Sequence, residues 1–213
     1  SKKKVYLFDS FEGFPEITIL ENDKLRPSKI EEWHTDMTFK ATPPLGSILI
    51  GKIIPKSGGD TLFGSLSAAY NDLNDTLKNK LDKLTATHSF AHGFKESLEE
   101  GHGIKKLQIA VKENPPVIHP VIRTHPENGK KLVFVNALFT EKINGVSENE
   151  SKELLDFLCS HIKKDKYTCR FKWEKDSIAF WDNRSVIHKP DNNYWPQLRR
   201  MERITIDDTV SPK

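Results

Sequence analysis

Two residue types that bind metal ions lie close together in the segment WHTDMTF, which runs from Trp33 to Phe39. His34 and Asp36 are two residues apart, and in an extended strand residues i and i+2 point to the same face. The pair is therefore suited to holding one metal ion. A polar strand end without any chemical role would show the same spacing, so the pair alone does not distinguish the two interpretations.

A third candidate ligand, His188, lies in the segment FWDNRSVIHKP. It follows the apolar run SIAFW by a few residues, so we expect it just past the end of a strand. Two histidines and one carboxylate on one face of an octahedral metal leave three open positions, which is typical of non-haem Fe(II) oxygenases. Zinc hydrolases also use histidine and carboxylate ligands, usually in a tetrahedral site with one open position. Spacing alone does not separate these two classes.

Two arginines near the end of the chain extend this chemistry. In QLRRMERITI, Arg199 and Arg203 share one face of a predicted strand with Met201. Guanidinium groups bind carboxylate or sulfonate oxygens through paired hydrogen bonds, so two of them beside a metal would suit two anionic groups. A solvated basic strand is the alternative for these arginines when they are considered without the metal motif.

The composition limits the classes of protein that the chain can represent. Its 213 residues suit one domain, and 36% apolar and 30% charged residues suit a globular protein. The net charge of +3 is small and we find no basic stripe, so we expect no nucleic-acid partner. Neither an apolar run of roughly 18 residues nor a signal peptide is visible, which favours a cytoplasmic protein without a membrane partner. A homo-oligomer is compatible with the sequence.

The elements that must position these residues are mostly short strands separated by turn signals. The predicted strands are Ser47–Ile54, Pro116–Thr124, Lys131–Val135, Thr168–Trp173, Ser177–Trp181 and Arg203–Ile206. The Asn-Gly pair in HPENGKK predicts a hairpin. One helix is expected from about Ser65 to Leu84 and another from Ser147, where Glu150 completes a capping box. Many strands with few helices predict a mainly β sandwich or barrel with helical insertions.

The motifs together resemble the taurine dioxygenase (TauD/TfdA) family of Fe(II)- and 2-oxoglutarate-dependent dioxygenases over nearly the whole chain. The matching segments, in family order, are WHTDMTF, TPPLGSIL, SGGDTLFGS, NPPVIHPVIRTHPENGKKLVFVN, WDNRSVIH and PQLRRMERITI. The resemblance implies a mainly β fold with flanking helices, the double-stranded β-helix or jelly roll. It also implies a single domain over residues 1–213, with Fe(II), 2-oxoglutarate and O2 as the reagents.

The resemblance also implies roles for individual residues in binding iron and the co-substrate. His34, Asp36 and His188 would be the iron ligands. Arg199 would pair with the distal carboxylate of 2-oxoglutarate, assisted by the hydroxyl group of Thr61.

The remaining roles concern the substrate, which the resemblance implies is a small anionic organic molecule. Arg203 matches the arginine that binds the sulfonate in sulfonate-cleaving members, and Met37, Phe94 and Phe139 match positions near the substrate. Hydroxylation of the carbon next to sulfur or oxygen would release sulfite or sulfate, an aldehyde, succinate and CO2. A carboxylated substrate such as an aryloxyacetate, or a non-catalytic jelly roll that binds an anion, remains an alternative.

The sequence departs from the family pattern at two places. Taurine-specific members have an asparagine four residues before the first histidine ligand, where it contacts the substrate amine, but this chain has Ile30. An apolar side chain cannot hydrogen-bond an ammonium group, so we expect another sulfonate or an alkyl sulfate to fit better than taurine. The family also has an N-terminal segment with a further substrate-binding histidine. We find no such histidine in SKKKVYLFDS, and the region after Phe94 is shorter than the family pattern. The expected alternatives are a protein that lacks these features and a sequence that omits them.

Overall fold

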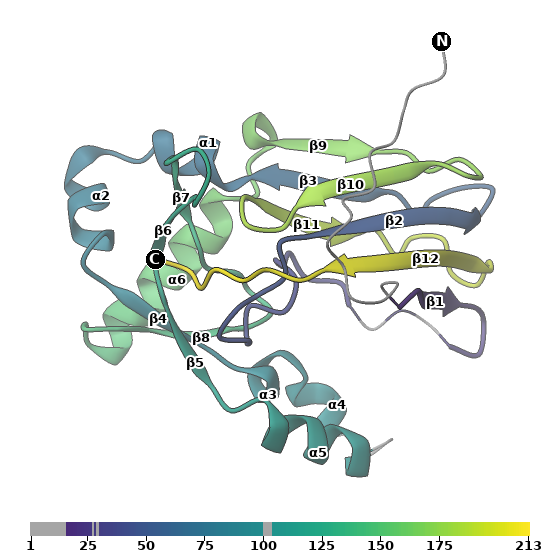
Figure 1. Ribbon diagram of the computed structural model, residues 1–213, viewed down its shortest axis with the longest axis horizontal. Helices are drawn as coiled ribbons and strands as arrows, with labels where there is room; N and C mark the ends of the chain where they lie inside the picture. The colour runs from purple at the N-terminus through teal and green to yellow at the C-terminus, as the bar shows by residue number, and fades with distance from the viewer. Residues whose placement is uncertain (1–15, 27, 29, 100–103) are drawn as a thin grey trace.

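The computed structural model describes residues 16–26, 28, 30–99 and 104–213 (Figure 1). The prediction about the N-terminal segment concerns residues outside these ranges. The strands are β1 Thr18–Asn22, β2 Gly46–Ile53, β3 Thr61–Ser65, β4 Thr85–His88, β5 Val117–Pro120, β6 Ile122–Thr124, β7 Lys131–Val133, β8 Thr140–Asn144, β9 Thr168–Phe171, β10 Ile178–Asp182, β11 Val186–Pro190 and β12 Arg199–Ile206. The helices are α1 Leu66–Asn71, α2 Asp75–Leu81, α3 Phe90–Gly93, α4 Lys95–Glu99, α5 Ile104–Glu113, α6 Glu148–His161 and the 3-10 turn η1 Asp165–Tyr167.

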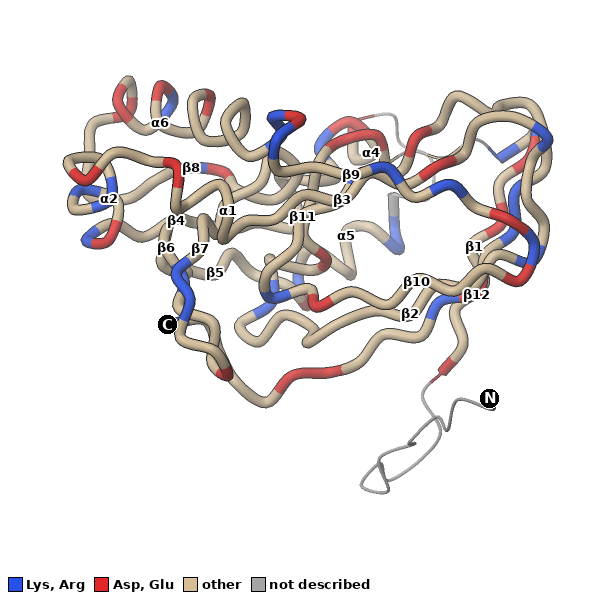
Figure 2. Tube along the Cα trace, turned by 90° about the horizontal axis from the view of Figure 1, so that it is seen from above, with Lys and Arg blue, Asp and Glu red and all other residues tan. Residues whose placement is uncertain are grey.

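Two antiparallel sheets face each other and form the main body of the fold. One has the strand order β1-β12-β2-β10 and the other β11-β3-β9. Figure 2 shows them as two layers. Apolar side chains from both sheets fill the space between them, and we call this set the sheet core. Its buried members are Leu49, Trp173, Ala179, Trp181 and Met201, with Leu20, Phe63, Phe171 and Val186 packed against them.

A second apolar cluster, the helix-side core, lies where α1, α2 and α6 cover the smaller sheets β5-β4-β8 and β6-β7 (Figure 1). Its fully buried members include Leu66, Leu81, Leu132, Leu158 and Ile187. Ile187 belongs to β11, so one strand contributes to both parts of the molecule. Its neighbour His188 points to the opposite side because side chains alternate along a strand.

Two predicted elements are wrong in their extent. The expected strand Pro116–Thr124 is divided between β5 and β6, which belong to different sheets. The expected helix from Ser65 to Leu84 is two helices, α1 and α2, separated by a turn. The cause is Asn74, whose side chain accepts a hydrogen bond from the backbone N–H of Leu77 and so begins a new helix. The leucines at helical spacing remain buried or half-buried, although they no longer belong to one helix.

The predicted hairpin at the Asn-Gly pair is confirmed, and the predicted capping box of α6 is confirmed only for its serine half. The side chain of Ser147 accepts a hydrogen bond from the N–H of Glu150 at the start of α6, as a capping box requires. The carboxylate of Glu150 instead contacts Lys80 of α2. The Asn-Gly turn joins the antiparallel strands β6 and β7, and Gly129 adopts a φ of 68°, a conformation that glycine tolerates best.

Charged residues of both signs are mixed along the described chain, as Figure 2 shows. This distribution agrees with the absence of a basic stripe in the sequence. Within the described residues, no helix combines the length and the apolar character that crossing a membrane demands.

We expect α6 to stabilise the fold mainly through the side chains that it buries in the helix-side core. Leu158→Ala removes a side chain with no exposed surface, and we expect the free energy of unfolding to fall by about 2–5 kcal/mol. Phe157 on the same helix is 45% exposed, so Phe157→Ala serves as the control and should cost much less. Urea denaturation of both variants measures the difference. Equal losses would contradict this assignment of the core.

Candidate functional site

Two histidines from distant parts of the chain are joined through their backbones. The N–H of His34 donates to the carbonyl of His188 at 2.9 Å, and the N–H of His188 donates to the carbonyl of His34 at 2.8 Å. This antiparallel bridge places both imidazoles side by side, with ring centroids 4.3 Å apart. Both side chains are buried. The expectation that His188 follows a strand end is wrong, because it lies within β11, paired with Phe63 of β3.

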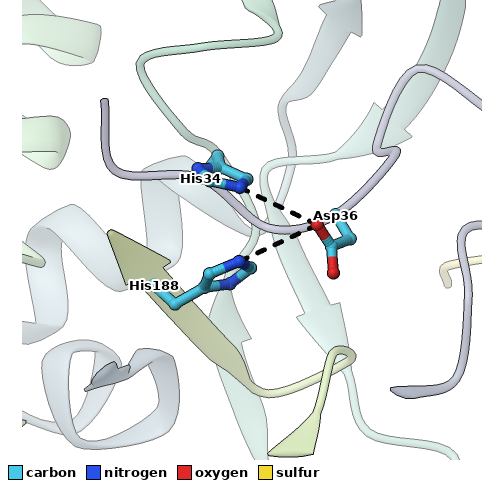
Figure 3. A group of neighbouring side chains, drawn as sticks. All are labelled: His34, Asp36 and His188. Carbon is cyan, nitrogen blue, oxygen red and sulfur yellow. Dashed lines mark ion pairs between the residues drawn. The ribbon is translucent and has the colours of Figure 1, made fainter. Parts of the chain in front are cut away.

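Asp36 completes a group of three buried side chains (Figure 3). Its Oδ1 lies 3.7 Å from Nε2 of His34 and 3.8 Å from Nε2 of His188. One ligand atom from each residue lies within 4.8 Å of the others, so a single cation could contact all three. His34 and Asp36 do not lie on one face of an extended strand, as their spacing suggested, because Asp36 begins a turn. Met37 follows with a φ of 52°, a strained conformation for a residue with a side chain.

The protonation states also suit a cation. Nδ1 of His34 donates to the carbonyl of Glu32 at 2.8 Å, which leaves the lone pair of Nε2 directed at the site. Burial, with a contribution from His34, lowers the pKa of His188 to about 3, so that imidazole is neutral. Burial acts to raise the pKa of Asp36, but the groups around its carboxylate, including Arg203 and the hydroxyl group of Ser47, outweigh it and the pKa is lowered. Two imidazole nitrogens and one carboxylate form a donor set that fits a divalent metal.

Two residues that the sequence analysis did not identify hold Asp36 in place. The hydroxyl group of Ser47 donates to Oδ2 of Asp36, and the side chain of Asn183 bonds the backbone of Asp36. The available signals were weak. Ser47 is a polar residue at the head of the apolar strand SILIGKII, and Asn183 lies inside the WDNRSVIH motif without a predicted role.

Arg199 is a buried cation. Its Nε donates to the carbonyl of Gly59 at 3.2 Å, and its guanidinium group lies 5.7 Å from the ring centre of Tyr194. Burial lowers the pKa of Arg199. Among the described residues, no carboxylate forms an ion pair with it. A buried guanidinium without a counterion favours the binding of an anion.

Thr61 lies two residues after Gly59, and its hydroxyl group accepts a hydrogen bond of 2.9 Å from the indole N–H of Trp173. Because an indole N–H can only donate, the hydroxyl hydrogen of Thr61 is left for another acceptor. The site therefore offers a cation and a hydroxyl donor in the same region of the sheet core.

Arg203 extends toward the three metal-binding candidates. Its Nη1 lies 3.8 Å from Oδ1 of Asp36, and its side chain is 29% exposed. The register of β12 against β2 shifts between Arg200 and Met201, where Lys52 is the extra residue on β2. The pairing of β12 with β1 continues without a shift, so alternation along β12 is maintained, as predicted for Arg199, Met201 and Arg203.

Aromatic residues cover one side of the metal-binding candidates. Phe139 is buried and meets the ring of His34 edge-on, with centroids 6.5 Å apart. The ring centroid of Phe94 lies 6.2 Å from that of Phe139 and 4.6 Å from that of Phe90. Phe94 and Ile30 also line one cavity of about 410 Å³. The structure therefore brings Phe139 to the site directly and places Phe94 behind it.

Comparisons with known proteins agree with this geometry. The sequence profile described as "Taurine catabolism dioxygenase TauD, TfdA family" matches residues 3–205. An alkylsulfatase of Acinetobacter baylyi is 34% identical over 196 residues, which are 91% of this chain and 62% of that protein. An alpha-ketoglutarate-dependent sulfate ester dioxygenase of Pseudomonas putida is 33% identical over 196 residues, which are 90% of this chain and 64% of that protein.

A solved structure extends the similarity to the fold. The crystal structure of a taurine dioxygenase from Burkholderia xenovorans superimposes with a TM-score of 0.77 at 32% identity, covering 95% of this chain and 67% of that one. The predicted jelly roll is thus confirmed. The chain spans less than two thirds of the length of the two curated relatives. The profile match, the identities and the shared fold together establish that the chain belongs to the TauD/TfdA family of dioxygenases.

Proposed function

We propose that this protein is an Fe(II)- and 2-oxoglutarate-dependent dioxygenase that hydroxylates a small organic sulfonate or alkyl sulfate. The observation that carries the proposal is the convergence of Nε2 of His34, Oδ1 of Asp36 and Nε2 of His188 on one point. The family membership of the chain supports it, and so do the names of relatives that act on sulfate esters.

His34, Asp36 and His188 would hold the iron through one atom each. Their side chains come from one bridge and the adjoining turn, so they would approach the metal from one side and leave room for other ligands. Bound iron supplies the oxidising chemistry, in which O2 converts 2-oxoglutarate to succinate and CO2 and hydroxylates a C–H bond of the substrate.

Arg199 and Thr61 would bind the distal carboxylate of 2-oxoglutarate. Arg199 supplies a buried positive charge that lacks an ion-pair partner among the described residues. Thr61 supplies a hydroxyl hydrogen, since Trp173 already occupies its acceptor side. Together they would orient the co-substrate so that its other end reaches the metal.

Arg203 would bind the sulfonate or sulfate group of the substrate. Its position 3.8 Å from Asp36 would bring the carbon next to sulfur or oxygen close to the metal. Phe139 would shield this region from water. The hydroxylated carbon then carries both a hydroxyl group and the anionic leaving group. Transfer of the hydroxyl proton to solvent forms the aldehyde carbonyl and expels sulfite or sulfate.

The metal-binding role of Asp36 is tested by Asp36→Ala. We expect loss of metal binding and of succinate formation, because the remaining two imidazoles provide no charge to hold the cation. The measurements are metal titration by calorimetry and succinate release with a sulfonate substrate. Asp75→Ala is the control, since that carboxylate is 97% exposed and distant in sequence from the site. Turnover by Asp36→Ala without added ligands would disprove the assignment.

Substitution of Arg199 and substitution of Arg203 should raise the KM of different reagents. Arg203→Ala should raise the KM of the sulfonate or sulfate substrate by about 10- to 100-fold and change that of 2-oxoglutarate much less, since a charge-assisted hydrogen bond contributes about 1.5–3 kcal/mol. Arg199→Ala should have the opposite pattern. Initial rates at varied concentrations of each reagent measure both effects. A reversed result would mean that the two arginines exchange roles.

The identity of the residue at position 30 should influence substrate choice. Ile30 is half-buried and lines the cavity beside Phe94. We expect alkyl sulfates and amine-free sulfonates to be used better than taurine. Ile30→Asn should raise the relative kcat/KM of taurine by about 5- to 10-fold, as one new hydrogen bond contributes about 1 kcal/mol. A panel that includes aryloxyacetates measures the preference by coupled succinate formation. Preferred use of aryloxyacetates would favour the carboxylated-substrate alternative.

A further inference from the structure

Asp36 is held by two side chains that divide its contacts between the carboxylate and the backbone. Ser47 of β2 donates its hydroxyl hydrogen to Oδ2 at 3.0 Å, and Ser47 has no exposed surface. Oδ1 instead faces the two histidines. The hydroxyl group therefore occupies one carboxylate oxygen and leaves the other for a metal.

Asn183 fixes the turn on which Asp36 lies. Its Oδ1 accepts from the N–H of Asp36 at 2.8 Å, and its Nδ2 donates to the carbonyls of Asp36 at 3.0 Å and Pro44 at 3.1 Å. The backbone N–H of Asn183 donates to the carbonyl of Leu45 at 2.8 Å. The amide thus satisfies one donor and two acceptors at once, which neither aspartate nor alanine can do.

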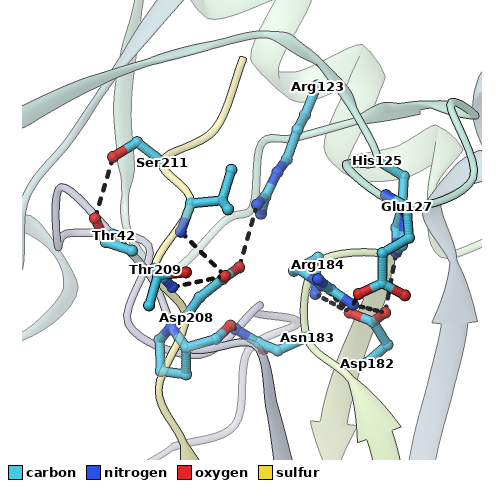
Figure 4. Close-up of polar contacts among 12 residues, drawn as sticks. Thr42, Arg123, His125, Glu127, Asp182, Asn183, Arg184, Asp208, Thr209 and Ser211 are labelled. Carbon is cyan, nitrogen blue, oxygen red and sulfur yellow. Dashed lines mark hydrogen bonds and ion pairs between the residues drawn. The ribbon is translucent and has the colours of Figure 1, made fainter.

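The turn that carries Asn183 is itself anchored by ion pairs (Figure 4). Asp182 accepts two hydrogen bonds from the guanidinium group of Arg184, at 2.9 and 2.8 Å, and lies 3.0 Å from Nε2 of His125. Arg184 also pairs with Glu127 at 2.8 Å. Asp182 and Arg184 are the sequence neighbours of Asn183, so their ion pairs limit the movement of its side-chain amide.

We propose that Ser47 and Asn183 are positioning residues that present Asp36 to the metal through Oδ1 alone. This inference rests on the proposed function, because it concerns the same metal. Its consequence is geometric. A carboxylate bound through one oxygen occupies one coordination position, whereas a carboxylate free to rotate could occupy two. Ser47 would thereby keep one coordination position of the metal open for the reagents. Asn183 would hold the turn so that Oδ1 of Asp36 faces the two histidines.

The test compares Ser47→Ala and Asn183→Asp with the unsubstituted protein, all prepared metal-free and titrated with Co(II). Ser47→Ala removes one oxygen atom, and Asn183→Asp keeps the shape of the side chain while placing an acceptor against two carbonyls. We expect both variants to bind Co(II) about 10- to 100-fold more weakly, as is found for groups that orient metal ligands. We also expect a changed visible absorption spectrum of bound Co(II) in Ser47→Ala.

Ser151→Ala is the matched control. Ser151 is also buried, and its hydroxyl group accepts a hydrogen bond of 2.8 Å from the N–H of Ile143, but it lies on α6 and contacts none of the three candidate ligands. Its loss should lower the Tm of the metal-free protein without changing Co(II) affinity or the spectrum. A comparable loss of affinity in Ser151→Ala would overturn the proposal, since general loosening would then explain the effect.

The remaining outcomes separate the two levels of inference. Co(II) binding by Ser47→Ala and Asn183→Asp within twofold of the wild type, with an unchanged spectrum, would overturn the positioning roles and leave the proposed metal site intact. A wild-type protein that binds no Co(II), Mn(II) or Fe(II) would overturn the metal site and, with it, the positioning roles.

Discussion

The two backbone hydrogen bonds between His34 and His188 hold together parts of the chain that lie near its opposite ends. One partner precedes β2 and the other belongs to β11, so the bridge joins a connecting segment to the sheet β11-β3-β9. It brings the two imidazoles together and sets the start of the turn that carries Asp36. Arg203 and Phe139 lie at the site because each is close to a residue that this bridge positions. Arg203 is close to Asp36, and Phe139 is close to His34.

The electrostatics of the site follow from burial. Removing His188 from water disfavours its charged form, which keeps an imidazole lone pair available. The pKa of Asp36 is lowered because surrounding groups, among them Arg203 and the hydrogen bond from Ser47, outweigh the cost of burial. A cation placed among these groups would meet the carboxylate of Asp36 and the imidazole nitrogens of His34 and His188. Such a donor set would suit a divalent metal that also accepts anionic ligands.

The sequence predicts much of this arrangement, and the missed parts share a physical cause. His34, Asp36 and His188 could be identified because metal ligands need particular residue types, and the strands because apolar runs are bounded by turns. The break at Asn74 was missed because an apolar helical periodicity continues across it, and only the side-chain cap ends the helix. Ser47 was missed because its hydroxyl group acquires a partner only when β2 packs against the turn. The contact between Asn183 and Asp36 spans 147 residues and has no local signal.

Strand β11 links the proposed metal site to the apolar core. Ile187 fills the helix-side core and has no exposed surface, while the adjacent His188 faces the opposite direction, toward the site. A slip of β11 by one residue would exchange these directions, burying an imidazole among leucines and presenting an alkyl group to the cation. Only the native register would therefore complete the proposed metal site and the apolar core together. A metal bound there would stabilise the native register of β11 relative to the slipped one, because the slipped chain lacks one of the three ligands.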